Sequence, residues 1–253
     1  MGFFDKIKSG FDAVLHPATC AICNEYHEYS MYWVCRKCWK NIGEETVPAS
    51  QNIETDKIGV ISAYFGWHHQ DGIRQLIHSL KYQKHHSIGW KIGLAVRERL
   101  AGSIDFSQID YLIPVPLHKK RAKERGFNQS FLLACGMASG HKNLHVVNAL
   151  HRAKFTDSQV MLSGEARRNN VKNAFALNQR IAKKMHGSSV AIIDDVLTTG
   201  ATSLACCSAL ETAQVAHIKI ITVALAGFLA DMPDNVYPAK AAIGSIKKDG
   251  IWG

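Results

Sequence analysis

The sequence has no uninterrupted apolar run of about 18 residues, which is the length that a membrane-spanning helix needs. Its first residues, Met-Gly-Phe-Phe-Asp-Lys-Ile-Lys, place charges where an export signal needs an apolar core. These two absences argue against a transmembrane or secreted protein. They predict a cytoplasmic one, with a position near the inner face of the membrane left open. The 253 residues are enough for one α/β domain and a small additional module.

Acidic residues are scarce in the middle of the chain. Over the whole sequence, 30 Lys and Arg residues stand against 21 Asp and Glu residues, and the formal net charge is +9. The excess is concentrated centrally, and clustered positive charge attracts phosphate groups. We therefore predict an anion-binding face rather than an evenly solvated basic surface. Its candidate residues are Lys81, Lys84, His118, Lys119, Lys120, Arg121, Arg125, Arg152, Lys154, Arg167, Arg168 and Lys172.

The seven cysteines do not indicate disulfide bonds. Three of them stand among small or apolar residues, as buried thiols usually do: Cys135, Cys206 and Cys207. The other four form two Cys-x-x-Cys pairs, Cys20-Ala-Ile-Cys23 and Cys35-Arg-Lys-Cys38.

Two Cys-x-x-Cys pairs let four thiolates converge tetrahedrally on one Zn²⁺, each sulfur about 2.3 Å from the metal. The pattern predicts a zinc site with the ligands Cys20, Cys23, Cys35 and Cys38. Two unrelated buried or redox pairs are the alternative, and His16 or His27 are alternative ligands. A metal with four thiolate ligands has no open position, so the site is expected to be structural rather than catalytic.

The chain divides into a small module, a linker, a main domain and a tail. Apolar residues at three- and four-residue spacings predict an amphipathic helix over 3–15, which fits docking on its own domain better than contact with a membrane surface. Residues 41–57 are polar and typical of a linker. The predicted divisions are the helix and zinc module at 1–45, the linker at 46–57, the main domain at 58–230 and the tail at 231–253.

Apolar runs alternate with helical patterns in the main domain. Strands are predicted at 58–67, 109–115, 190–193 and 218–226, and helices at 72–82, 88–100, 127–138 and 201–213. This order predicts a doubly wound, mainly parallel α/β sheet. In such sheets ligands bind where strands end and helices begin.

Two carboxylates and a glycine-containing turn follow the buried strand at 190–193. Asp194 and Asp195 come first, and Thr198-Thr199-Gly200-Ala201-Thr202 leads into the next helix. Free N–H groups at the positive end of a helix dipole suit a phosphate, and threonine hydroxyls add donors. Two adjacent carboxylates beside an anion site are unfavourable unless they bind something, such as sugar hydroxyls or a Mg²⁺ held by a diphosphate. The alternative is an ordinary turn that caps a helix.

This string closely resembles the phosphoribosyl diphosphate (PRPP) motif of type I phosphoribosyltransferases, and the resemblance implies their fold. It also implies that Asp194 and Asp195 hold the ribose hydroxyls. The residues expected around the 5′-phosphate are Thr198, Thr199, Gly200, Ala201 and Thr202. Some members of that family carry a general-base carboxylate where this sequence has Thr198, so no catalytic residue is assigned.

Two further motifs precede this loop. Residues 113–129 read Ile-Pro-Val-Pro-Leu-His-Lys-Lys-Arg-Ala-Lys-Glu-Arg-Gly-Phe-Asn-Gln and predict an exposed basic loop between the strand and the next helix. Residues 150–175 carry a second set of Arg and Lys. Three motifs in this order, behind a four-cysteine module, resemble the ComF family of competence proteins, which includes ComFC and GntX-like proteins. The resemblance covers nearly the whole chain, from Cys20 to about Ala226.

The resemblance implies a cytoplasmic DNA-uptake factor in natural transformation that binds single-stranded DNA and PRPP. It also implies cooperation with a ComFA-type helicase where one exists. The basic residues would then contact DNA or the diphosphate of PRPP, and the candidates for stacking on bases are Tyr82, Trp90, Phe127 and Phe155. Structural Zn²⁺, and Mg²⁺ bound with PRPP, are the expected cofactors.

The alternative to a DNA-handling factor is an active phosphoribosyltransferase in nucleotide metabolism or salvage. Such an enzyme needs a site for the attacking base or amine, and no base-recognising segment is evident. Nor is there a glutaminase domain of the kind that supplies ammonia to amidophosphoribosyltransferases.

Overall fold

The structure is a computed structural model, and it describes residues 19–26, 34–43, 50–55, 59–82, 86–152 and 174–226. The helix predicted at 3–15, the tail at 231–253 and the alternative ligands His16 and His27 lie outside these residues. So do several candidate anion-contacting and stacking residues: Lys84, Lys154, Phe155, Arg167, Arg168 and Lys172.

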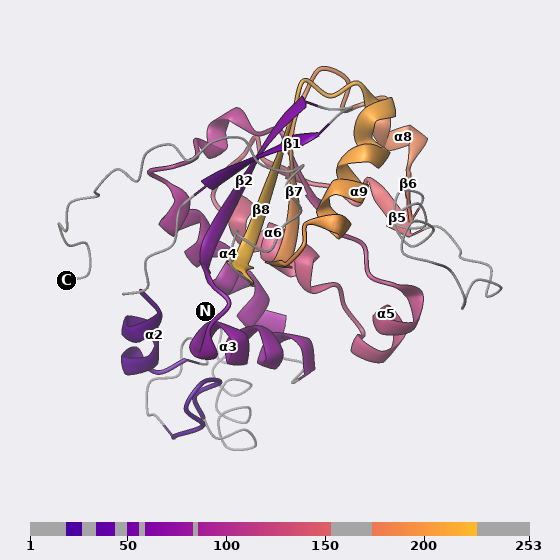
Figure 1. Cartoon of the computed structure of the whole chain (residues 1–253). Helices are drawn as coiled ribbons and strands as arrows, with labels where there is room; N and C mark the ends of the chain where they lie inside the picture. The colour runs from indigo at the N-terminus through magenta and orange to yellow at the C-terminus, as the bar shows by residue number, and fades with distance from the viewer. Residues whose placement is uncertain are drawn as a thin grey trace, which may run out of the picture.

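A six-stranded sheet with the order β1-β2-β8-β7-β3-β4 forms the centre of the molecule (Figure 1). Its strands are β1 (Ser50–Thr55), β2 (Gly59–His68), β3 (Tyr111–Pro114), β4 (His145–Val146), β7 (Ser189–Leu197) and β8 (His217–Leu225). Only β1 pairs antiparallel with its neighbour in this sheet. A separate antiparallel pair joins β5 (Leu150–Arg152) to β6 (Phe175–Leu177). The parallel strands all end at one edge of the large sheet, which we call the carboxyl edge.

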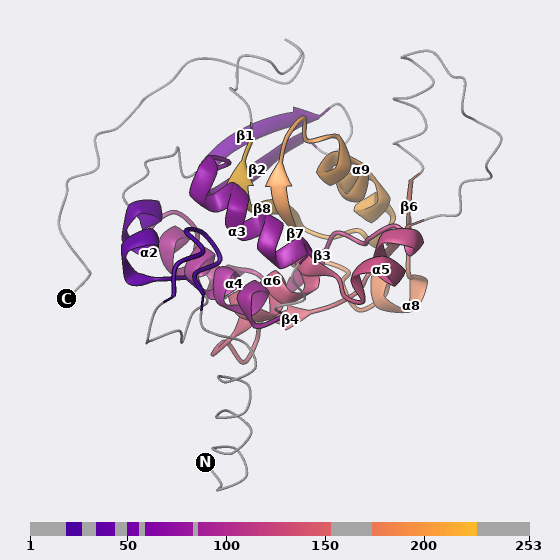
Figure 2. The ribbon, with the colours of Figure 1, turned by 90° about the horizontal axis from the view of Figure 1, so that it is seen from below.

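Helices cover both faces of the sheet (Figure 2). One face carries α3 (Asp71–Tyr82), α4 (His86–Leu100) and α6 (Gln129–Ala138), and the other carries α9 (Ala201–Leu210). The remaining helices are α2 (Arg36–Gly43), α5 (Lys119–Arg125), α8 (Gln179–Ala182) and the 3-10 helices η1 (Phe106–Gln108) and η2 (Glu211–Ala213).

Each face of the sheet has its own apolar core, because successive strand residues point to opposite faces. In β7, Ile193 packs into the core beneath α3, α4 and α6, whereas Ile192 packs into the core beneath α9. Both side chains are fully buried. A strand buried on both sides reads as a continuous apolar run, which is why 190–193 was recognisable in the sequence.

The predicted fold class is confirmed: the chain is α/β, with a mainly parallel sheet, helices on both faces and a four-cysteine cluster before it. The predicted helices and strands of the main domain are all present. β7 runs to Leu197, beyond its predicted end, because Asp194 and Val196 continue the pairing with β8. No helix in the described part of the chain is both long enough and apolar enough to cross a membrane.

Two predicted irregular segments are regular structure instead. Residues 50–55, assigned to the linker, form the edge strand β1, in which Ile53 is buried and Asn52 accepts a hydrogen bond from the Ser62 hydroxyl. An edge strand with so few apolar residues shows almost no alternation of apolar and polar residues in the sequence. The basic segment predicted as an exposed loop forms α5, which His118 caps and which ends at Gly126 in the left-handed conformation (φ 79°).

The backbones of α4 and α6 come into direct contact at two glycines. A Cβ atom on Gly93 would overlap the carbonyl oxygen of Leu133, and one on Gly136 would overlap that of Trp90. No side chain fits at either position while the helices keep this separation. The close approach fixes α6 relative to α4, and with it the first turn of α6 at the carboxyl edge.

Candidate functional site

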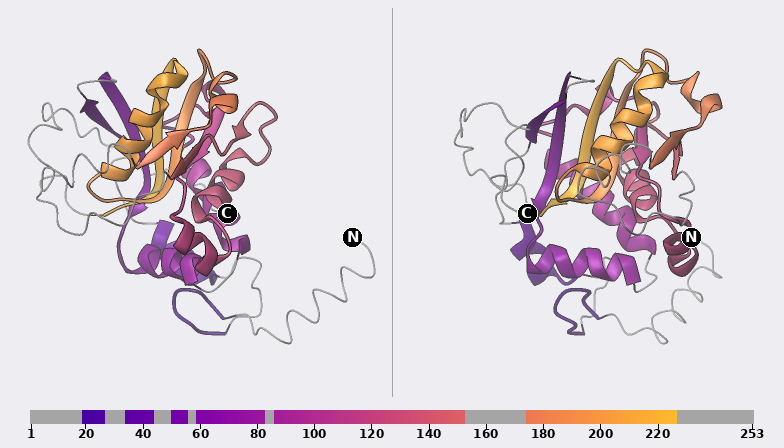
Figure 3. Two further views of the ribbon diagram at one scale, coloured as in Figure 1. Left: turned by 90° about the vertical axis from the view of Figure 1, so that its right-hand side faces the viewer. Right: turned by 45° about the vertical axis from the view of Figure 1, so that its right-hand side comes forward.

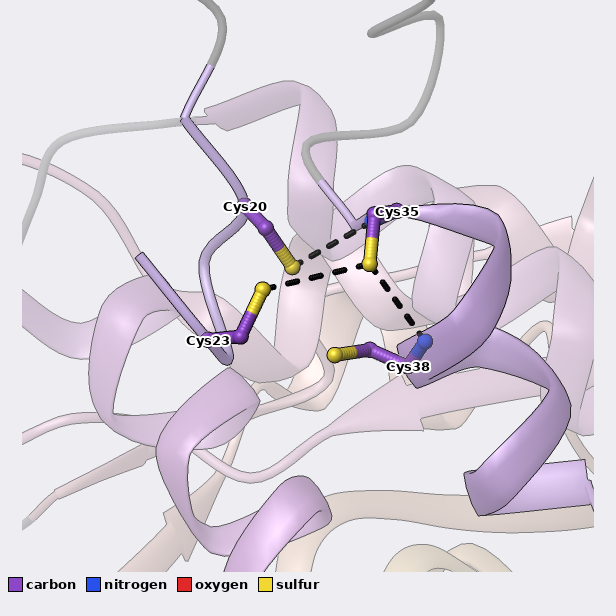
Figure 4. A group of neighbouring side chains, drawn as sticks. All are labelled: Cys20, Cys23, Cys35 and Cys38. Carbon is purple, nitrogen blue, oxygen red and sulfur yellow. Dashed lines mark hydrogen bonds between the residues drawn. The ribbon is translucent and has the colours of Figure 1, made fainter. Parts of the chain in front are cut away.

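The two Cys-x-x-Cys pairs bring four sulfur atoms together, from a turn and from the start of α2 (Figure 4). All four Sγ atoms lie within 4.8 Å of one another, and those of Cys23 and Cys35 are 3.9 Å apart. Sulfurs bound tetrahedrally to one Zn²⁺ at about 2.3 Å would be about 3.8 Å apart. The geometry therefore fits a single structural metal ion held by the four cysteines that the spacing predicted.

Backbone N–H groups support negative charge on these sulfurs. The N–H of Cys35 donates to Sγ of Cys20 over 3.2 Å, and the N–H of Cys38 donates to Sγ of Cys35 over 3.4 Å. Burial opposes ionisation of Cys20, but donation from the N–H groups of Cys23, Cys35 and Ile22 brings its pKa down to about 7. Burial and the neighbouring thiols raise the pKa of Cys38. Ionisation of one cysteine of the cluster is therefore favoured. Ionisation of a second one is unfavourable unless a cation compensates the added negative charge.

The four-cysteine segment packs against α3, which lies across the carboxyl edge of the sheet (Figure 3). Cys20 and Ile42 are buried in the same core as Ile73 of α3. The Ser79 hydroxyl of α3 donates to the carbonyl oxygen of Ala21 over 3.2 Å. Because α3 starts after β2 and Lys81 in its last turn reaches Asp195 of β7, one helix links the cysteine cluster to the end of that strand.

The acidic pair, Asp194 and Asp195, occupies the end of β7 at the carboxyl edge. Asp195 is 6% exposed and points to the face that α3 and α6 cover. Asp194 extends from the opposite side of the strand, where its charge acts on the thiol of Cys206 in α9. Its Oδ1 accepts the N–H of Asp195 over 2.8 Å and the hydroxyl of Ser130 over 3.3 Å.

Asp195 is held by two side chains that donate to the same oxygen. Lys81 Nζ lies 2.8 Å from Asp195 Oδ2, and Gln129 Nε2 donates to that oxygen over 3.1 Å. Arg125 Nη1 donates to the amide oxygen of Gln129 over 2.6 Å, and the Arg125 guanidinium lies 5.7 Å from the centre of the Tyr82 ring. Since Tyr82 follows Lys81 in α3, these contacts close a ring through α3, β7, α6 and α5. We call the five residues the Asp195 network.

The surroundings of the acidic pair strengthen electrostatic interactions. Burial, followed by the charge of Asp195, raises the pKa of Asp194 to about 7. Burial, followed by the charges of Lys81 and Arg74, lowers the pKa of His69, which lies directly after β2. Both shifts indicate a region in which an unpaired charge is unfavourable. The first turn of α6 offsets part of this penalty for the carboxylates, because a helix N-terminus carries positive partial charge.

The predicted phosphate loop lies between β7 and α9. Gly200 is buried, adopts the left-handed conformation (φ 71°) and precedes α9 without a side-chain cap. Thr198, Thr199 and Thr202 are exposed, and within the described residues their hydroxyls have no hydrogen-bond partner. The loop therefore presents hydroxyls and uncapped N–H groups next to the acidic pair.

The other predicted anion-contacting residues lie around this edge. His118, Lys120 and Arg121 are exposed at or in α5, while the Lys119 side chain is not among those described. Arg152 in β5 lies over the Phe175 ring, 5.5 Å from its centre. Its Nε is buried and has no hydrogen-bond partner within the described part of the chain.

Sequence reasoning missed Gln129, Ser130 and His69 as site residues. A signal for two of them was present: Asn128 is a preferred N-cap residue, and its side chain accepts the N–H of Ser130 over 3.0 Å. Such a cap after a strand end places the next two residues in the first turn of a helix that faces the carboxyl edge. Their two partners, 64 and 66 residues away, have no local signature.

Comparison with known proteins identifies relatives over most of the chain. The DNA utilization protein YhgH of Salmonella typhi is 27% identical over 197 residues, which are 75% of this chain and 82% of that protein. Competence protein F of Haemophilus influenzae is 40% identical over 92 residues, 36% of this chain and 39% of its own length. Competence protein ComFC of Bacillus subtilis is 36% identical over 92 residues, 36% of this chain and 34% of its own length.

The chain is thus similar in sequence to DNA utilization and competence proteins. The chain spans little more than a third of the length of the two competence proteins that it matches. No family model matches it. The solved structure of an allosteric regulatory enzyme of purine biosynthesis aligns with 70% of the chain over 36% of its own length. Its TM-score is 0.41 and its identity 14%.

Proposed function

We propose that this ComF-type protein acts in DNA uptake, binding PRPP at the acidic pair and single-stranded DNA beside it. The names of its relatives, which concern competence and DNA utilisation, support the role in DNA uptake. The observation that supports PRPP binding is the acidic pair, which lies at the carboxyl edge next to α9, a helix that begins after Gly200 without a side-chain cap.

PRPP offers vicinal hydroxyls, a 5′-phosphate and a diphosphate, and the edge has a complementary group for each. Asp194 Oδ2 and Asp195 Oδ1 accept no hydrogen bond from any described residue, so each carboxylate keeps one oxygen for a hydroxyl. The exposed threonines and the first turn of α9 suit a phosphate. Arg152, whose Nε is buried and has no hydrogen-bond partner among the described residues, is the candidate for the diphosphate. Mg²⁺ would enter with that diphosphate as its counter-ion.

Replacing both carboxylates tests the PRPP site. Asp194→Ala combined with Asp195→Ala should abolish PRPP binding in isothermal titration calorimetry while the circular dichroism spectrum stays that of a folded protein. The matched control is Glu98→Ala, which removes an exposed carboxylate from α4 and should leave binding unchanged. PRPP binding that survives in the double variant would contradict the assignment.

Single-stranded DNA is the proposed second ligand because basic and aromatic groups adjoin at the same edge. α5 exposes Lys120, Arg121 and Lys123, and Tyr82 next to it is 65% exposed. A positively charged groove with aromatic surfaces is the usual means of binding single strands without sequence preference. Arg125, which lies over the Tyr82 ring, joins the two elements.

Salt dependence tests DNA binding along α5. The affinity for a fluorescent oligo-dT should fall with salt along a log–log line whose slope is about 0.7 per phosphate contacted. Lys120→Gln combined with Arg121→Gln should lower that slope, whereas Lys40→Gln on α2 should not. A slope corresponding to fewer than about two released ions in the wild type would contradict a groove that follows the backbone.

We also propose a cofactor, a location and a partner for this protein. Zn²⁺ is assigned to the four-cysteine cluster because four thiols at these separations match its preferred ligands and geometry. A cytoplasmic location and a ComFA-type helicase as partner follow from the DNA-uptake role, and co-purification with such a helicase would test the latter. The names of the relatives do not favour the alternative of a salvage phosphoribosyltransferase. Diphosphate release from PRPP in the presence of a base or an amine would revive it.

A further inference from the structure

Lys81 stands between two anionic partners of the proposed function. Its ammonium group is 2.8 Å from Asp195 Oδ2, where PRPP is proposed to bind. It is followed by Tyr82, whose side chain is 65% exposed beside α5, where DNA is proposed to bind. The Lys81 side chain is 24% exposed and that of Asp195 is 9% exposed. The cation thus lies at the boundary between a buried carboxylate and solvent.

The two donors to Asp195 Oδ2 differ in their freedom to leave. Gln129 is 6% exposed and lies in the first turn of α6, and its amide oxygen is held by Arg125. Lys81 is in the last turn of α3 on a flexible four-carbon stem, so its ammonium can swing by several ångströms without backbone movement. Loss of Lys81 would therefore leave Asp195 with one hydrogen bond and an uncompensated charge.

We propose that Lys81 is an exchangeable counter-charge: it neutralises Asp195 in the free protein, leaves that carboxylate when PRPP brings its ribose hydroxyls and Mg²⁺ to the acidic pair, and then pairs with a phosphate of DNA bound beside α5. The inference rests on the proposed function and adds a regulation to it. Because the same cation cannot serve both partners, a ligand that satisfies Asp195 makes Lys81 available to DNA. PRPP and single-stranded DNA should consequently bind with positive coupling, each increasing the affinity for the other.

The sign of the coupling separates this exchange from simple electrostatics. PRPP is itself a polyanion, and if it only occupied basic residues it would weaken DNA binding. If Lys81 stayed on Asp195 and merely held it in place, the two ligands would bind independently or compete. If PRPP with its Mg²⁺ releases Lys81 from Asp195, DNA binding is instead expected to tighten.

The experiment measures the affinity of the full chain for fluorescent oligo-dT with and without saturating PRPP and Mg²⁺, at constant ionic strength. We expect PRPP to tighten oligo-dT binding by about 5-fold or more, the lower end of the range usual for coupled sites. Inorganic diphosphate with Mg²⁺ is the control ligand, since it carries the charge without hydroxyls for Asp195. It should leave the affinity unchanged or weaken it.

Matched variants locate the coupling. Lys81→Gln should bind both ligands, with oligo-dT bound equally well in the presence and absence of PRPP. Lys81→Arg keeps the charge and should retain part of the enhancement, which excludes a misfolded Lys81→Gln chain as the cause. Lys120→Gln on α5 should weaken oligo-dT binding but keep the full enhancement, because it does not contact the acidic pair.

The possible outcomes distinguish failure of the Lys81 exchange from failure of the proposed function. Enhancement by PRPP that is absent with diphosphate and lost in Lys81→Gln supports the exchange. Independent or competitive binding in the wild type overturns it while leaving the proposed function intact. Failure of the wild type to bind PRPP or oligo-dT at all overturns the proposed function, and the exchange with it.

Discussion

The cysteine cluster and the acidic pair are both groups of ionisable side chains, and they differ in how their charge is compensated. The four thiols surround one point and are hydrogen-bonded to one another and to backbone N–H groups. The acidic pair is compensated by a lysine, an amide and a hydroxyl of the chain itself. The first arrangement calls for a metal ion, and the second already contains its cation. An external ion is therefore expected to matter for stability at the cysteines and for ligand binding at the carboxylates.

Metal removal should have the largest effect. Cys35→Ser should lose the single bound metal ion measured by elemental analysis and should lower the melting temperature strongly, since structural zinc contributes on the order of 10 kcal/mol in small modules. Cys135→Ser, which alters a partly buried thiol of α6 outside the cluster, should keep the metal. If the wild type keeps its melting temperature when the metal is removed, the cysteine cluster does not need an external ion for stability, and it does not differ from the acidic pair in this respect.

Lys81→Met should have the next largest effect, because it takes the cation from the acidic pair. We expect the free energy of unfolding to fall by about 1–3 kcal/mol near neutral pH in urea titrations, less than for a fully buried pair because Lys81 borders solvent. Lys142→Met, at an exposed position, makes the same charge change and should be near neutral. Equal effects of the two substitutions would show that the ion pair contributes nothing beyond surface charge.

Asp194→Asn should change the pH dependence of stability. Burial raises the pKa of Asp194 from 3.8 to about 7, so between these values the folded protein keeps a proton that the unfolded chain has lost. The stability contributed by this proton is complete below the lower value and is lost as pH rises through the higher one. The variant should therefore be about 1–2 kcal/mol more stable than wild type above about pH 8, and closer to it near pH 4. Parallel stability profiles would contradict the raised pKa.

Gly200→Ala should have the smallest effect on stability and a selective one on binding. An alanine at φ 71° strains the backbone by about 1 kcal/mol. Gly187, in the turn before β7, has nearly the same φ of 70° and open space around it, so Gly187→Ala should lower stability equally. Only the substitution at Gly200 should weaken PRPP binding, because Gly200 lies in the predicted phosphate loop and Gly187 does not. Equal PRPP affinities would mean that the loop is not part of the site.

The sheet and the cysteine cluster could be predicted from the sequence because both leave local patterns. Ile192 and Ile193 lie in a four-residue apolar run, and the cysteines keep a fixed spacing. The strand β1 could not be predicted, because an edge strand with Ile53 as its buried apolar residue needs its partner strand to become visible. The helix α5 was predictable in retrospect: Gly126 follows seven good helix formers, a common C-terminal signal.

The acidic pair could be placed from the sequence, but the residues around it could not. Asp194 and Asp195 stand at a strand end, where the fold class alone predicts a ligand. Lys81 was selected for its charge and expected to meet an anionic ligand, whereas the structure pairs it with a carboxylate of the chain. Its partner lies 114 residues further along the chain, a relation that the packing of α3 across the sheet establishes.

The contact between α4 and α6 limits which of their residues can change during evolution. Most apolar residues of the two helices can exchange for others of similar volume, so their identities are free to drift. Gly93 and Gly136 cannot, because any side chain would separate the helices and move the first turn of α6 away from the acidic pair. We expect both glycines to persist in relatives whose core residues have diverged, marking the inheritance of the site more reliably than the hydrophobic pattern around them.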